Sequence, residues 1–228
     1  GIEKNAYVWA KDVYNGESVP DWMLPYQRIF YENYILETVE NVPVDSINVI
    51  QWKNVKGSAL FCRAFDFYSL ADEFAKPFDS VTAATDPGIP LPLNSDINGK
   101  TARASVLETY NQAIQDLRAA LLLLPDLPAF KTRPSKAAAF ALLARAFLNM
   151  GNYEQSLLYA DSCIMLQPHL LDYNKMNSAS SYPFPIFNDE VIYHKTLYRF
   201  RIIGNRVAIP DSTIYASYDP NDLRKILF

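Results

Sequence analysis

Apolar residues recur at helical spacing along most of the chain, most clearly between residues 136 and 166. The expected first helix of this stretch carries charge only at Lys136 and Arg145, which predicts a buried helix that is apolar nearly all round. Gly151 and Pro168 are expected to end the two helices, so the stretch predicts a helical hairpin. The second helix should have one apolar face, made by Tyr153, Leu157, Ala160 and Ile164.

Two further helices are predicted upstream, over residues 21–40 and about 46–75. The first has an apolar stripe that Asn33 interrupts, and we expect Asn33 to be a buried amide bonded to a neighbouring turn. The second is apolar on two sides, which predicts a central position, and Gly57 should allow another helix to approach closely. The stripe of the first helix comprises Trp22, Tyr26, Ile29, Asn33 and Leu36.

Prolines and glycines break the pattern over residues 76–103, which are expected to form a long surface loop. Ser105 and Glu108 then have the spacing of a capping box, which predicts a helix to about Leu124. Residues 169–228 are expected to be rich in loops, with a short strand over 190–194 and a helix starting at Asp222. Turns are predicted at Gly204-Asn205, Pro210-Asp211 and Asp219-Pro220.

An internal repeat groups these helices in pairs. Arg63-Ala64-Phe65 recurs as Arg145-Ala146-Phe147, each in the first helix of a pair. The spacing of 15 between Tyr110 and Pro125 recurs between Tyr153 and Pro168 in the second helices. The pattern is typical of tetratricopeptide (TPR) units, which stack because neither can bury its apolar face alone. We predict a mainly α fold of TPR-like hairpins in an α-α superhelix, with long loops and a little β structure near the C-terminus.

Composition narrows the class of partner. The chain has 21 basic and 25 acidic residues, and its formal net charge of -4 argues against nucleic acid, which requires a basic footprint. The 15 Tyr, 13 Phe and 3 Trp residues favour core filling at most positions and an exposed binding platform at some. Cys62 and Cys163 lie among apolar neighbours in expected helices and are predicted to be free, buried thiols.

The sequence contains no motif for catalysis, for a cofactor or for a metal ion. It lacks His-Glu-x-x-His, Gly-x-Ser-x-Gly and a glycine-rich phosphate loop, and His169 and His194 lie 25 residues apart without further ligands at metal spacing. Asp86 and Asp96 could be imagined as a glycosidase pair, but two acids on a solvated loop are ordinary, because glycosidase acids need a shaped, partly buried site. We therefore expect a protein that is not an enzyme.

The order of short motifs along residues 21–224 resembles that of the SusD/RagB family of Bacteroidetes outer-membrane lipoproteins, the nutrient-binding proteins of starch-utilization systems. No single motif is specific, but their joint order spans nearly the whole chain. The motifs are Trp22-x-x-x-Tyr26-x-x-Ile29 with Asn33, Lys56-Gly57-x-Ala59-x-x-x-Arg63-Ala64, Gly88-Ile89-Pro90-Leu91, Arg103-Ala104-Ser105-Val106 with Tyr110, Leu123-Leu124-Pro125, Ser135-Lys136-Ala137-Ala138, Ala144-Arg145, Gly151-Asn152-Tyr153-Glu154, Leu171-Asp172-Tyr173-Asn174, Asn188-Asp189-Glu190 and Asp222-Leu223-Arg224.

The resemblance implies a lipid-anchored protein on the extracellular face of the outer membrane, whose anchoring cysteine is not in this chain. Such proteins capture oligosaccharides, or in some cases peptides, for import by a SusC-like TonB-dependent transporter. The resemblance also implies that residues 1–228 are one N-terminal helical domain, about half of a typical member and truncated at the C-terminus. Its parts would be an irregular aromatic segment over 1–20, the TPR-like helices over 21–168 with the 76–103 loop, and the loop-rich segment over 169–228.

Family members place glycan-contacting aromatic residues in loops, and residues 7–14 offer such a cluster. We expect Trp9 to be a stacking platform for a sugar ring, with Tyr7 and Tyr14 beside it and with Lys11 and Asp12 as partners of the sugar hydroxyls. The alternative is that Trp9 packs on the helical stack as a cover.

Two other functions stay open at this point. A TPR-type scaffold for protein–protein interaction, or a peptide-binding member of the same family, would rest on the repeat alone. The apolar first helices of the pairs disfavour the scaffold, because their faces should be covered. A glycosidase using Asp86 and Asp96 would release sugar, and none is expected.

Overall fold

The computed structural model describes residues 1–99, 102–196 and 211–227. The chain divides into two compact units. The larger comprises Val19–Pro168 and Ile192–His194, and the smaller comprises Gly1–Ser18, His169–Val191 and Lys195–Phe228.

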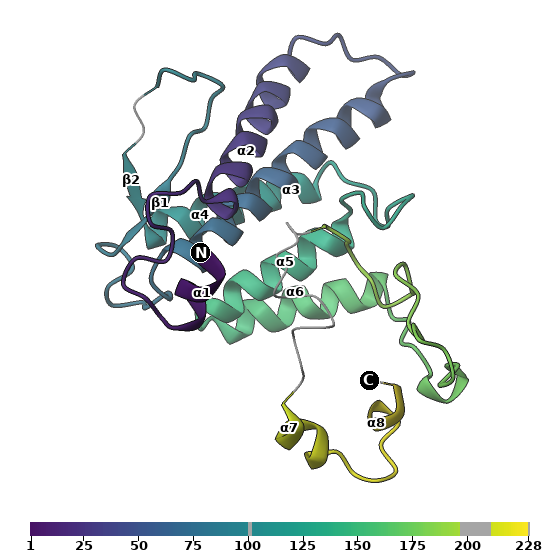
Figure 1. Ribbon diagram of the computed structural model, residues 1–228. Helices are drawn as coiled ribbons and strands as arrows, with labels where there is room; N and C mark the ends of the chain where they lie inside the picture. Colours follow the sequence, from purple (N-terminus) through teal and green to yellow (C-terminus); the bar gives the residue numbers. More distant parts are fainter. Residues whose placement is uncertain (100–101, 197–210, 228) are drawn as a thin grey trace. The chain divides into compact units, whose positions relative to one another are not determined.

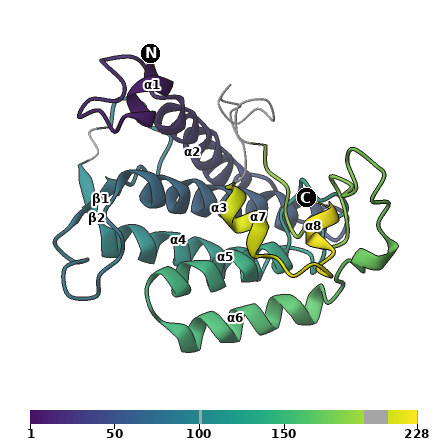
Figure 2. The same cartoon turned by 60° about the horizontal axis from the view of Figure 1, so that its bottom comes forward.

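The larger unit is a stack of long helices, each packed against the next in sequence (Figures 1 and 2). Figure 2 shows the layer from α2 at one edge to α6 at the other. This arrangement confirms the mainly α class and the stacking of helical pairs, with the 21–40 helix at one end. The helices are α2 (Pro20–Val39), α3 (Val49–Phe74), α4 (Val106–Leu121), α5 (Lys136–Asn149) and α6 (Tyr153–Leu166).

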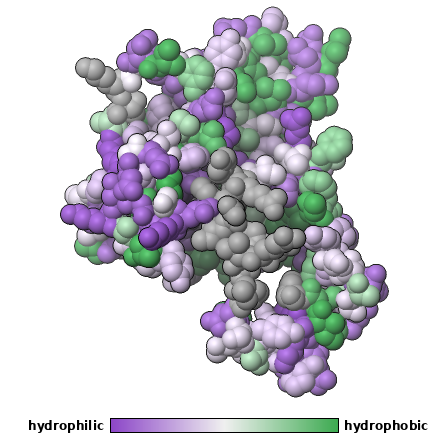
Figure 3. All heavy atoms as spheres, viewed as in Figure 1, coloured by the Kyte–Doolittle hydropathy of each residue, from purple (hydrophilic) through white to green (hydrophobic). Residues whose placement is uncertain are grey.

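Helix α3 is the central element of the core. Ala59 and Asp66 are buried on one of its sides, and Ala64 and Phe67 on the other, which confirms the predicted two-sided burial. Gly57 allows a close approach as predicted, but the approaching segment is the turn after α4 and not a helix, because a Cβ atom on Gly57 would lie 2.9 Å from Leu123 Cβ. Apolar side chains also reach the surface, where Figure 3 shows them among hydrophilic residues.

The helix ends follow the predicted local chemistry. Ser105 Oγ accepts from Glu108 N at 3.1 Å while Ser105 N donates to the Glu108 carboxylate at 2.7 Å, so the capping box is confirmed. Gly151 has φ +71°, the left-handed conformation that glycine adopts at little cost, and it separates α5 from α6 as predicted. Asn152 then caps α6 by accepting from Gln155 N.

The segment 76–103, expected to be a loop, also contains strand structure. Strand β1 (Pro87–Pro90) pairs antiparallel with β2 (Arg103–Ser105), with Pro87 opposite Ser105 and Pro90 opposite Arg103. A Cβ on Gly88 would lie 2.5 Å from Ser105 O, so the close pairing requires glycine. The sequence did not predict this strand, because the prolines at both of its ends are typical of loops.

The apolar face predicted for α6 is present in the sequence, but it is not the face that packs in the core. Tyr153, Leu157 and Ile164 are 71%, 63% and 60% exposed. The helix instead turns Cys163 and Tyr159 toward α5, where the Tyr159 ring stacks on Phe147 at 5.6 Å between centroids. Cys163 is buried, as predicted, whereas Cys62 is only half-buried, and the two cysteines are not joined in a disulfide.

The smaller unit has short helices: α1 (Ile2–Tyr7), the 3₁₀ turn η1 (Tyr173–Lys175), α7 (Ser212–Ser217) and α8 (Arg224–Leu227). Helix α1 corrects the expectation that residues 1–20 are wholly irregular. Asp222 caps α8 by accepting from Arg224 N, which confirms a helix starting near Asp222.

Two other predictions for the C-terminal quarter meet different outcomes. No strand forms over 190–194; Tyr193, in the larger unit, packs edge-on against Phe61 instead, with 5.0 Å between ring centroids. Residue 210 and the Gly204-Asn205 turn lie outside the described residues, while Asp211 caps α7 by accepting from Thr213 N.

Candidate functional site

The N-terminal segment that carries the predicted aromatic cluster is held in place by local hydrogen bonds. Helix α1 ends at Tyr7, and Trp9 follows with φ +54°, which reverses the direction of the chain. Ala10 N donates to Asn5 O at 2.9 Å, and Asn5 Nδ2 donates to Val13 O at 3.1 Å. The helix therefore serves as the base of a short loop that projects Trp9.

Asp12 organises the second half of this loop. Its Oδ1 accepts from Tyr14 N at 3.1 Å and from Asn15 N at 2.8 Å. Asn15 and Gly16 both have positive φ, at 50° and 76°, and complete the turn. One carboxylate oxygen of Asp12, which is predicted to bind sugar hydroxyls, therefore already holds the loop in place.

The aromatic side chains of the loop are displayed to different degrees. Trp9 is 93% exposed and Tyr7 is 79% exposed, whereas Tyr14 is half-buried. Lys11 and Asp12 are exposed beside them. Such exposure is what a stacking platform requires.

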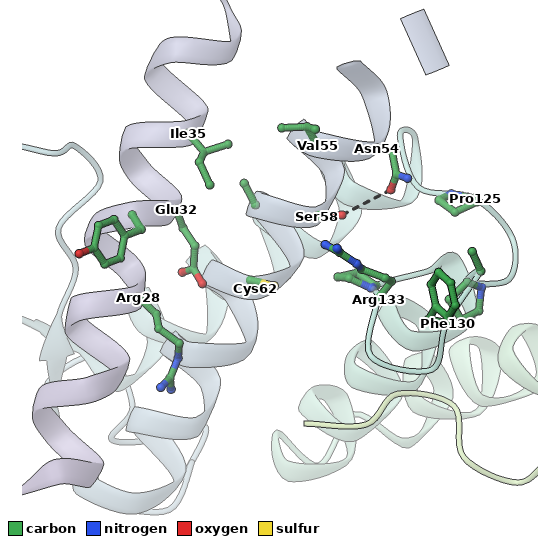
Figure 4. A pocket seen from close by; sticks show the side chains of 15 residues that line it. Arg28, Glu32, Ile35, Asn54, Val55, Ser58, Cys62, Pro125, Phe130 and Arg133 are labelled. Atoms are coloured by element: carbon green, nitrogen blue, oxygen red, sulfur yellow. Dashed lines mark hydrogen bonds between the residues drawn. The ribbon is translucent and has the colours of Figure 1, made fainter. Parts of the chain in front are cut away.

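A second candidate site, a groove, lies in the larger unit and could not be recognised in the sequence. A groove with a volume of about 680 Å³ runs between α2, α3 and the segment that joins α4 to α5 (Figure 4). Figure 4 shows Arg28 and Glu32 of α2 on one side and Phe130 and Arg133 on the other. No local motif could reveal it, because its residues come from three elements distant in sequence. Their positions range from residue 28 to residue 134.

The groove is lined by both apolar and polar side chains. Ser58 Oγ lies 3.4 Å from Asn54 Oδ1 on one turn of α3. Arg28 is bound to the fully buried Asp66 by two hydrogen bonds, of 2.7 and 2.9 Å, and this bonding raises the pKa of Arg28 above its ordinary value. The volume and the mixed lining suit a small ligand with both apolar and hydroxyl surface.

Asn33 has the structural role that the sequence predicted. Its Nδ2 donates to Pro92 O and to Asn94 O, both at 2.9 Å, in the loop that follows β1. Tyr26 OH donates to Pro90 O at 2.9 Å, and Ser95 N donates to Glu37 Oε1 at 2.8 Å. One face of α2 therefore holds the end of β1 and the loop after it through side chains spaced along three turns.

The acids considered for glycoside hydrolysis take structural roles. Asp86 accepts from Lys76 Nζ and from Thr82 Oγ1, both at 2.6 Å, and these bonds hold its pKa below the ordinary value. A general acid needs the opposite shift. Asp96 Oδ1 accepts from Asn98 N at 2.9 Å.

Residues 1–99, 102–196 and 211–227 contain no group of three or more His, Cys, Asp or Glu side chains suited to holding a metal ion. Nor does any helix there combine the length and the apolar character needed to cross a bilayer.

Known proteins provide an independent test of the family. Residues 2–148 match a SusD-like family whose description is "Starch-binding associating with outer membrane". SusD-like protein P2 of Formosa agariphila is 26% identical over 198 residues, covering 75% of this chain and 37% of that protein.

Solved structures agree with this match. A putative sugar binding protein from Bacteroides vulgatus superposes with a TM-score of 0.62 at 28% identity, over 67% of this chain and 34% of that one. A SusD superfamily protein from the same species reaches a TM-score of 0.68 at 22% identity, over 77% and 40%. The matched part of the chain thus spans little more than a third of the length of these relatives. It belongs to the SusD-like family.

Proposed function

We propose that this protein is a non-catalytic, cell-surface capture protein for oligosaccharides. The observation that carries the proposal is the family match over residues 2–148, together with the description of that family as starch-binding. The similar Bacteroides vulgatus protein, described as a putative sugar binding protein, supports the same ligand class. Attachment to the outer membrane through a lipid and delivery to a SusC-like TonB-dependent transporter belong to the proposal.

The binding site that we propose is the loop over residues 7–14. A sugar ring presents a flat patch of C–H groups, which packs on an aromatic face, while polar neighbours bind its hydroxyls. Trp9 provides the largest exposed face and Tyr7 the second, with Lys11 and Asp12 as hydrogen-bonding neighbours and the half-buried Tyr14 in the same loop. The hydrogen bonds that Asp12 accepts from Tyr14 N and Asn15 N support this proposal, because they fix the conformation of the loop before a ligand binds.

The test is isothermal titration calorimetry of the protein against soluble polysaccharides and a peptide library. Trp9→Ala should abolish glycan binding, whereas Tyr153→Ala, which removes an exposed aromatic ring from α6, should leave it unchanged. Loss of binding in Phe130→Ala but not in Trp9→Ala would move the site to the groove. The absence of binding to every glycan and peptide would contradict the proposed function.

The second candidate is recognition of a peptide, by a member of the same family or by a TPR-type scaffold. The observation in its favour is the groove, whose mixed lining also suits an extended peptide with apolar side chains. Binding of peptides without any glycan affinity in the same titrations would favour this candidate. Sugar release from the polysaccharides would instead indicate an enzyme, and we expect none.

A further inference from the structure

Charge is distributed unevenly around the groove of the larger unit. Two of the three segments that line it, residues 49–62 of α3 and residues 125–136, carry five basic residues and a single acidic one, Asp126. The third segment, α2, contributes Glu32 and the ion-paired Arg28. An occupant with a negative charge should therefore be attracted to the side formed by α3 and the 125–136 segment. The five basic residues are Lys53, Lys56, Lys131, Arg133 and Lys136.

Arg133 is the cation best placed to meet a negatively charged group. It is exposed and lines the groove, and within the described part of the chain it forms no ion pair. Arg28, by contrast, already binds both carboxylate oxygens of Asp66. Figure 4 shows the Arg133 side chain pointing toward the turn of α3 that carries Asn54 and Ser58. A planar guanidinium matches the two oxygens of a carboxylate, and the amide and hydroxyl groups can bind sugar hydroxyls beside it.

The backbone that carries Arg133 is fixed at several points. Arg133 N donates to Phe130 O at 2.8 Å, and His194 N donates to Lys131 O at 2.7 Å. Ser135, two residues further on, is fully buried and caps α5. The segment is therefore ordered before a ligand binds, which lowers the entropic cost of binding.

The remaining lining favours a sugar over a peptide. Phe130 is 71% exposed and Tyr31 of α2 is 55% exposed, and the C–H face of a sugar ring packs on such rings. An extended peptide binds largely through backbone hydrogen bonds. The groove offers few backbone N–H groups for this, because helices bond their own and proline has none. The prolines that line it are Pro125, Pro128 and Pro134.

We propose that the groove is a second glycan site, selective for sugars that carry a carboxylate, the uronic acids. Arg133 binds the carboxylate, Phe130 supports the ring, and Asn54 and Ser58 bind hydroxyls. The inference rests on the proposed function, because it takes glycans as the ligands, and it adds to that function a site and a class of sugar. The groove volume of about 680 Å³ suits a short acidic oligosaccharide.

The test is calorimetric titration with tetragalacturonic acid and with its methyl ester, which keeps the sugar rings and removes the charges. The Trp9→Ala variant is the background, so that the loop over residues 7–14 does not contribute. The acid should bind at least about tenfold more tightly than the ester. Arg133→Gln should remove this preference, and Phe130→Ala should weaken binding of the acid. The matched control, Arg145→Gln, removes an exposed arginine of α5 outside the groove and should leave the affinity within about twofold.

Equal affinity for the acid and the ester, or an equal loss in the two arginine variants, would overturn the proposal. A tetraglutamate peptide provides the other decisive comparison. If it bound as tightly as the acid and depended on Arg133, the groove would be a site for acidic peptides, and the proposal would again be wrong. Neutral glycans separate this inference from the proposed function. If they bind through Trp9 while the acid is not preferred, only the inference fails, whereas no binding of either kind of glycan contradicts both.

Discussion

Arg63 and Asp116 form a two-bonded ion pair between α3 and α4, with Nε and Nη2 of the arginine each 2.7 Å from a carboxylate oxygen. The side chains are 10% and 4% exposed. The remaining arginine nitrogen, Nη1, donates to Asn33 Oδ1 at 2.8 Å, and Asn33 in turn holds the loop after β1. A buried network of polar side chains thus links α2, α3 and α4 with the loop after β1.

Removing one partner of the Arg63–Asp116 pair should destabilise the fold more than replacing both partners with apolar residues. Arg63→Met leaves a buried carboxylate without its partner, so we expect the free energy of unfolding to fall by about 3–5 kcal/mol. The double variant Arg63→Met with Asp116→Leu removes both charges and should be clearly more stable than the single one. Urea unfolding followed by circular dichroism measures both, and an equal loss in the two variants would contradict the argument.

An exposed ion pair provides the control for this comparison. Lys136 Nζ lies 2.7 Å from Asp126 Oδ1, with side chains 34% and 64% exposed. Because water screens this pair, Asp126→Ala should change the free energy of unfolding by less than about 1 kcal/mol.

Gly57 should resist the substitution that usually stabilises a helix. Alanine in place of a helical glycine ordinarily gains about 0.5–1 kcal/mol. Here the new Cβ would meet Leu123 Cβ at 2.9 Å and Leu124 Cγ at 3.1 Å, so Gly57→Ala should instead lower the free energy of unfolding by about 1–3 kcal/mol. Ser58→Ala, at the next position, should stay within about 0.5 kcal/mol. A gain of stability in Gly57→Ala would show that the helices can move apart freely.

The contact between Glu37 and Ser95 should depend on pH. Hydrogen bonds from Ser95 lower the pKa of Glu37 below its ordinary value of 4.5. A lowered carboxyl pKa in the folded state means that the contact contributes stability above pH 4.5 and loses it as the pH falls through the lowered value. Exchange of the Ser95 amide proton, after correction for intrinsic rates, should therefore accelerate in that acidic range. In Glu37→Gln this additional acceleration should be absent.

The sequence predicted the long elements well because their signals are local. Ser105 and Glu108 mark a helix start within four residues, and Gly151 marks a stop by itself. Asn33 could be interpreted correctly because a polar residue in an apolar stripe must find a partner. The identity of that partner, a pair of carbonyl groups about 60 residues away, depends on tertiary packing that no local pattern contains.

Features that depend on distant neighbours could not be obtained in this way. The stripe on α6 was correctly recognised as apolar, but periodicity does not say which of two apolar faces is covered. The repeated Arg-Ala-Phe triplet predicted a shared place in the repeat, yet Arg63 is buried in an ion pair while Arg145 is exposed, with its guanidinium 5.6 Å from the centroid of the Tyr68 ring. The groove is built from three separated elements, and the aromatic loop was found only because its residues are consecutive.

Trp9 and Trp22 should separate binding from stability. Trp9 is 93% exposed, so Trp9→Ala should change the free energy of unfolding by less than about 0.5 kcal/mol while removing glycan binding. The Trp22 ring packs against Phe74 and Tyr26, with 5.0 and 4.9 Å between centroids, so Trp22→Ala should cost about 3 kcal/mol. Urea unfolding of the two variants, paired with calorimetric titration of glycan, measures both effects. If Trp9→Ala destabilised the protein as much as Trp22→Ala does, Trp9 would be a packing residue, and the platform that we propose would have to lie elsewhere.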